Sequence, residues 1–105
     1  MFKRKNKIQN CDVDAEVAKS NYKKYLDELD KERQEYIKEL CTRIKKESRR
    51  GCKCVCTACS LEDFMSYDYM MNTLKPYFEQ RGFIVTEECN RSGILTSWLK
   101  IRWEE

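Results

Sequence analysis

The sequence predicts an α+β protein in which a long N-terminal helix precedes a small antiparallel sheet packed on one helix. Three observations predict this class. Apolar residues recur at spacings of three and four through the first half of the chain. Alternating segments with β-branched residues are concentrated in the second half. The three glycines fall at two expected helix ends and one expected turn. With 105 residues, the chain is long enough for one small domain.

The first expected element is a helix over residues 12–50, preceded by a basic arm over residues 1–11. Asp12 or Asp14 can cap its start, and Gly51 provides the left-handed exit at its end. A helix of this length spans about 55 Å, which exceeds the width of a domain of this size. It therefore either breaks near residue 30, where the sequence is polar on all sides, or continues as one long or kinked helix that needs a partner.

Residues 51–105 are expected to form the small α+β domain. The pattern predicts a strand over 52–59, a helix over 67–81 that ends at Gly82, a strand over 83–86, a turn at 90–93 and a last strand over 94–103. Because Pro76 removes one backbone hydrogen bond, this helix is expected either to be kinked there or to start late. Alternation along the last strand places one set of side chains on the inner face: Leu95, Ser97, Leu99, Ile101 and Trp103. Trp98, Lys100 and Arg102 then lie on the opposite face.

Seven cysteines are the least usual feature of the composition. The favoured interpretation is packing, because free cysteine behaves as a small buried hydrophobe and alternate positions of a strand would lie under a helix. The alternative is a zinc ion held by Cys54, Cys56 and Cys59, with either Cys52 or Cys89 as the fourth ligand. A third interpretation is redox chemistry of these thiols. An odd number of cysteines without an export signal predicts a reducing intracellular compartment.

The composition argues against most enzyme classes. Histidine is absent, which removes the commonest general base, and three glycines are too few for a phosphate-binding loop. We therefore expect no enzymatic activity, no cofactor and no small-molecule substrate. No segment approaches the ~18 apolar residues of a membrane span, so we expect no membrane association.

Two kinds of partner are expected instead. The favoured one is a protein, either another chain or a second copy, that contacts the helix and an exposed tryptophan: Tyr22, Tyr25, Leu29, Tyr36, Ile37 and Trp98. Residues 1–50 carry a net charge of +5 and residues 51–105 one of −2, giving +3 in total. The alternative partner is therefore nucleic acid, held by two basic groups: Lys3, Arg4, Lys5 and Lys7, and Lys45, Lys46, Arg49 and Arg50.

Three short stretches match a layout found elsewhere: residues 50–54 (RGCKC), 77–85 (YFEQRGFIV) and 98–103 (WLKIRW). In this order they resemble short uncharacterised proteins of tailed bacteriophages and large DNA viruses, in which a charged helix, a strand, a helix and a hairpin end on a tryptophan-containing strand. This sequence departs from that pattern at Arg102 and in its density of cysteines. The resemblance implies a non-enzymatic virion or accessory protein, located in the host cytoplasm or the virion, and no site residues to carry over.

Overall fold

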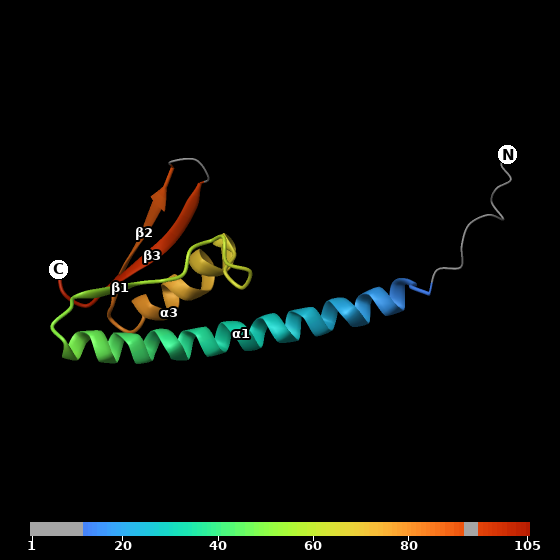
Figure 1. Ribbon diagram of the computed structural model, residues 1–105, viewed down its shortest axis with the longest axis horizontal. Coiled ribbons are helices and arrows are strands. Elements are labelled where there is room, and N and C mark those ends of the chain that lie inside the picture. Colours follow the sequence, from blue (N-terminus) through green and yellow to red (C-terminus); the bar gives the residue numbers. More distant parts are fainter. Residues whose placement is uncertain (1–11, 92–94) are drawn as a thin grey trace, which may run out of the picture. The chain divides into compact units, whose positions relative to one another are not determined.

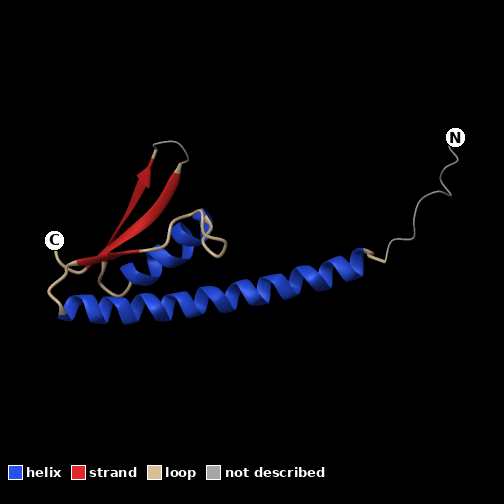
Figure 2. Cartoon of the chain, viewed as in Figure 1, coloured by secondary structure: helices blue, strands red, loops and turns tan. Residues whose placement is uncertain are grey.

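The computed structural model describes residues 12–91 and 95–105. Its elements are helix α1 (Ala15–Arg49), strand β1 (Cys54–Cys56), a helical stretch made of α2 (Tyr67–Tyr69), η2 (Met70–Leu74) and α3 (Lys75–Glu79), and strands β2 (Ile84–Asn90) and β3 (Thr96–Arg102) (Figures 1 and 2). This order confirms the predicted α+β class. The predicted basic arm and residues 92–93 of the predicted hairpin turn lie outside the described residues, whereas Asn90, which was expected in that turn, is the last residue of β2.

Helix α1 begins and ends on side-chain and backbone caps that the sequence indicates. Asp14 is the cap at the start, where its Oδ1 accepts a hydrogen bond from the Val17 N–H at 3.0 Å. At the end, Gly51 has a φ of 90°, and the Cys52 N–H donates to the Glu47 carbonyl at 3.0 Å. This is the Schellman arrangement, which favours glycine because an L side chain is strained there. The helix is continuous between these caps, without the break considered near residue 30.

The chain divides into two compact units, Met1–Lys31 and Glu32–Glu105. The boundary therefore falls within α1 rather than at its C-terminal end, where the sequence places it. In the second unit the C-terminal part of α1 belongs with the sheet and the shorter helices. No helix in the described part of the chain is both long and apolar enough to cross a lipid bilayer.

The sheet has three antiparallel strands in the order β1-β3-β2, so the last strand is central. Val55 of β1 and Val85 of β2 both pair with Ile101 of β3. Strand β1 is shorter than the expected 52–59, but hydrogen bonding to β3 continues beyond it. The Thr57 and Ser60 N–H groups donate to carbonyls of β3, and their hydroxyls accept from two of its N–H groups. The central strand thereby keeps its backbone paired without a longer β1.

The second helical stretch contains a π-helical turn in front of Pro76. The Lys75 N–H donates to the Met70 carbonyl, five residues earlier, over η2. Proline has no N–H and disturbs the preceding α-helical turn, and a π turn is one way in which a helix accommodates such a disturbance. The disturbance expected at this proline therefore takes the form of a π turn. The stretch ends at Gly82, whose φ is 91°.

The hydrophobic core lies on one face of the sheet, where α1 and the second helical stretch cover it. Ten apolar side chains are buried there: Tyr36, Leu40, Val55, Met65, Met70, Leu74, Phe78, Val85, Leu99 and Ile101. The alternation predicted for the last strand is confirmed between Ser97 and Ile101, which are buried at every second position. Leu95 is an exception, because it precedes β3 and is 64% exposed.

Burial corrects the interpretation of the cysteines as core residues. None of the six described cysteines is buried: Cys41, Cys52, Cys56 and Cys89 are exposed, and Cys54 and Cys59 are half-buried. For Cys54 and Cys56 the reason is the phase of β1. Val55 and Thr57 face the core, so the alternate positions occupied by cysteine face away from it.

Candidate interaction surfaces

The N-terminal part of α1 exposes apolar and aromatic side chains. All residues from 12 to 28 are exposed, including Tyr22 at 62% and Tyr25 at 54%. Their rings lie on the same side of the helix with centroids 6.4 Å apart. Leu29, one turn further on, is half-buried. Tyr22, Tyr25 and Leu29 thus retain the exposure that their predicted role as partner contacts requires.

Tyr36 and Ile37 were also predicted to contact a partner, but they pack within the Glu32–Glu105 unit instead. Tyr36 is 9% exposed, and its hydroxyl accepts a hydrogen bond from the Ala58 N–H. Ile37 is half-buried against the same core. The apolar periodicity of the helix is interrupted between Leu29 and Tyr36, because residues 30–35 are all polar, and the covering of this face changes across that interruption. The candidate partner surface on α1 therefore does not include these two residues.

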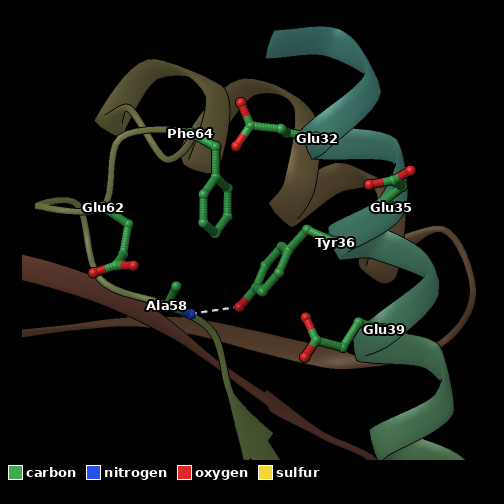
Figure 3. A pocket seen from close by; sticks show the side chains of 7 residues that line it. All are labelled: Glu32, Glu35, Tyr36, Glu39, Ala58, Glu62 and Phe64. Carbon is green, nitrogen blue, oxygen red and sulfur yellow. Dashed lines mark hydrogen bonds between the residues drawn. The ribbon is translucent and has the colours of Figure 1, made fainter. Parts of the chain in front are cut away.

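An open pocket of about 410 Å³ lies between α1 and the chain segment after β1 (Figure 3). Tyr36 and Phe64 form its aromatic part, with ring centroids 4.8 Å apart. Four carboxylates surround them: Glu32, Glu35, Glu39 and Glu62. None of the ion pairs between described residues involves these four groups. The pocket is therefore a negatively charged hollow over an aromatic pair, a combination that sequence analysis missed because Glu62 and Phe64 are far from α1 along the chain.

Burial raises the pKa of the Tyr36 hydroxyl above its ordinary value, and this predicts a loss of stability at alkaline pH. The unfolded chain releases a phenolic proton near pH 10, before the folded domain does, so stability falls as pH rises above about 10. We expect the Tyr36→Phe variant to show a shallower fall over this range, because it has no phenolic proton at this position. Urea unfolding midpoints of both proteins at several alkaline pH values would test this, and parallel curves would contradict it.

The face of the sheet opposite the core carries no buried side chain among the described residues. Trp98, Lys100 and Arg102 of β3 lie on it and are half-buried. The Trp98 Nε1–H donates to Glu88 Oε1 at 3.2 Å, which ties the indole ring to the neighbouring strand. Trp98 also lines a shallow hollow of about 350 Å³ together with Cys56 and Cys59. Trp98 is thus accessible enough for its predicted role in a contact patch.

The structure does not bring the four predicted zinc ligands together. Within residues 12–91 and 95–105, no group of three or more cysteine or acidic side chains is placed to hold a metal ion. Two of the thiols also have raised pKa values: the hydrogen bond to Glu47 raises the pKa of Cys52, and partial desolvation of the thiol raises that of Cys56. A raised pKa favours the neutral thiol, whereas metal binding and nucleophilic attack use the thiolate.

The basic residues divide between described and undescribed parts of the chain. Lys45, Lys46, Arg49 and Arg50 are exposed near the C-terminus of α1, where positive charge also stabilises the helix. Arg50 Nη1 lies 3.4 Å from Glu47 Oε2. The other predicted basic group, Lys3, Arg4, Lys5 and Lys7, lies outside the described residues.

Comparison of the chain with protein-family models, with curated proteins and with solved structures gives no match. The resemblance to short phage and viral proteins therefore remains a prediction from the sequence.

Proposed function

We propose that this protein is a non-enzymatic interaction protein that self-associates through the N-terminal part of α1. The supporting observation is the exposure of aromatic and aliphatic side chains on this segment, with Tyr22 and Tyr25 each more than half exposed. Exposed aromatic side chains that lie side by side are typical of protein contacts. In line with the resemblance, we further propose that such an assembly serves as a virion or accessory component of a virus or phage.

The spacing of the exposed residues supports pairing between helices. We define the N-terminal seam as Ala15, Ala18, Tyr22, Tyr25 and Leu29. Their separations alternate between three and four residues, which is the 3.5-residue average of a coiled coil. The seam extends for about 22 Å and two of its five positions are alanine, so we expect a weak dimer.

Charge favours a second copy in parallel orientation as the partner. Charges along the segment alternate in sign by blocks: acidic at Asp12, Asp14 and Glu16, basic at Lys19, Lys23 and Lys24, and acidic at Asp27, Glu28 and Asp30. An antiparallel pair centred on Tyr22 would place the lysine block against itself and the acidic blocks against each other. In a parallel pair, a residue beside the seam of one helix contacts the residue five positions further along the other helix. Asp14 of one copy therefore faces Lys19 of the other.

Sedimentation equilibrium over a range of protein concentrations tests this proposal. We expect the wild-type chain to form a dimer and the Leu29→Asp variant to be monomeric, because the substitution places two carboxylates in the seam. Ser20→Asp is the matched control: it adds the same charge on the opposite side of the helix and should leave the dimer intact.

The outcomes of this experiment are distinct. A wild-type protein that is monomeric at every concentration would overturn the proposal, and so would equal dimerisation of the Leu29→Asp variant. Far-UV circular dichroism should show the same helix content in both variants, which separates loss of assembly from loss of folding.

A further inference from the structure

The outer face of the sheet combines an aromatic platform with positive charge on its central strand. Trp98, Lys100 and Arg102 occupy alternate positions of β3, so their side chains leave the sheet on the same side. In the sheet register Lys100 lies between Cys56 and Thr86, and Arg102 lies between Cys54 and Ile84. These direct neighbours are uncharged, and the acidic side chain of this face is Glu88, which lies opposite Trp98 in the register.

The hollow beside Trp98 can receive a planar group. It is open, has a volume of about 350 Å³ and is lined by the Trp98 ring and by uncharged side chains, with Glu62 as its acidic member. The hydrogen bond from the indole to Glu88 holds the ring in place and uses this carboxylate for positioning. A base could therefore stack on the indole without first reorganising the ring.

The cations next to this platform have unused hydrogen-bonding capacity. Neither Lys100 nor Arg102 takes part in any ion pair found within the described ranges. At the edge of β1, the Arg43 Nη2 donates to the Cys56 carbonyl at 3.2 Å and adds a third positive group near the hollow.

We propose that this face binds single-stranded nucleic acid, with a base stacked on Trp98 and the phosphates next to Lys100 and Arg102. A single strand fits because its bases are free to stack, whereas a duplex hides their faces. Charge complementarity with phosphate favours nucleic acid over an apolar protein segment, which would have to cover two cations without pairing them. This inference does not depend on self-association through the N-terminal seam.

Fluorescence anisotropy tests the proposal with labelled oligodeoxythymidine and oligouridine of about 15 nucleotides, close to the upper site size of small sheet-based binders. We expect Trp98→Ala to weaken binding about 5- to 150-fold, and Trp98→Phe to retain most of it because phenylalanine also stacks. The double variant Lys100→Gln/Arg102→Gln should reduce the slope of log affinity against log salt by about 1.4, as expected for two lost contacts to single-stranded phosphate.

Lys45→Gln/Lys46→Gln is the matched control, because it removes the same charge from the end of α1. If this control weakened binding and the Lys100→Gln/Arg102→Gln variant did not, the site would be the helix terminus and the proposal would be overturned. Absence of binding to any oligonucleotide would also overturn it and leave this face to a protein partner.

Nuclear magnetic resonance tests the same site without altering the wild-type protein. The chain has two tryptophans, so its spectrum should contain two indole N–H signals, and the Trp98→Phe variant identifies one of them. Addition of oligodeoxythymidine should shift the Trp98 signal and leave that of Trp103, whose Nε1–H donates to the Cys52 carbonyl, nearly unchanged. A Trp98 signal that does not move at saturating oligonucleotide would contradict the proposal.

Discussion

The Leu40→Ala variant should lose ~2–5 kcal/mol of unfolding free energy, the largest effect that we expect of a single substitution. Leu40 lies on α1 and is fully buried. It belongs to the core cluster that includes Leu74, Leu99 and Ile101 from the second helical stretch and the sheet. Truncation removes apolar contacts and leaves a cavity there. Because small domains are stable by only about 5–15 kcal/mol, the variant should be partly unfolded at modest urea concentrations.

Leu26→Ala is the matched control, since it makes the same substitution on the same helix at a side chain that is 42% exposed. Both changes improve helix propensity equally, so the difference between them reports tertiary burial alone. Urea unfolding at low protein concentration would measure both variants, and we expect Leu26→Ala to lose less than about 1 kcal/mol. Equal losses at the two positions would show that Leu40 does not occupy the core.

The Thr57→Val variant should lose ~1–3 kcal/mol, although valine has nearly the same shape as threonine. The Thr57 hydroxyl accepts a hydrogen bond from the Leu99 N–H at 2.9 Å and donates to the Ala58 carbonyl at 2.9 Å. Thr57 is 8% exposed and Leu99 is fully buried. Valine would therefore leave a buried backbone N–H of the central strand without an acceptor, and the cost of leaving such a donor unpaired exceeds the gain from burying a methyl group.

Thr86→Val provides the comparison, because Thr86 is exposed on the outer face of β2 and valine has a higher strand propensity there. We expect its unfolding free energy to remain within about 0.5 kcal/mol of the wild-type value. Amide hydrogen exchange would add site-specific information: protection of the Leu99 N–H should fall in Thr57→Val and persist in Thr86→Val. Unchanged protection in Thr57→Val would show that another group accepts this hydrogen bond.

Local features of the sequence were sufficient for the order of the elements and for several of their ends. Gly51 and Gly82 both have positive φ and end helices, as their positions after apolar periodic segments predict. The division of the last strand into two faces between Ser97 and Ile101 also followed from alternation, because successive side chains of a strand point to opposite sides. These features depend on neighbouring residues and need no knowledge of the rest of the fold.

The candidate surfaces were predictable only in part. Tyr22, Tyr25 and Trp98 are exposed enough to contact partners, whereas Tyr36 is buried although it lies on the same helical stripe as Leu29. The cysteines were assigned to the core because alternation defines two faces of β1 without telling which one is covered. The acidic pocket in front of Tyr36 and Phe64 depends on residues brought together from distant segments, for which a single sequence contains no spacing signal.

The sequence by itself therefore determined the fold class, the capped ends of the helices and the two faces of the last strand, since these follow from local backbone preferences and side-chain periodicity. Only the tertiary structure decided which part of the apolar face of α1 is covered, which face of β1 meets the core and how Thr57 completes the hydrogen bonds of β3. The physical reason is that burial is a property of the whole fold. A periodic pattern states that one face is apolar, but the elements packed against it determine which of its residues remain available to a partner.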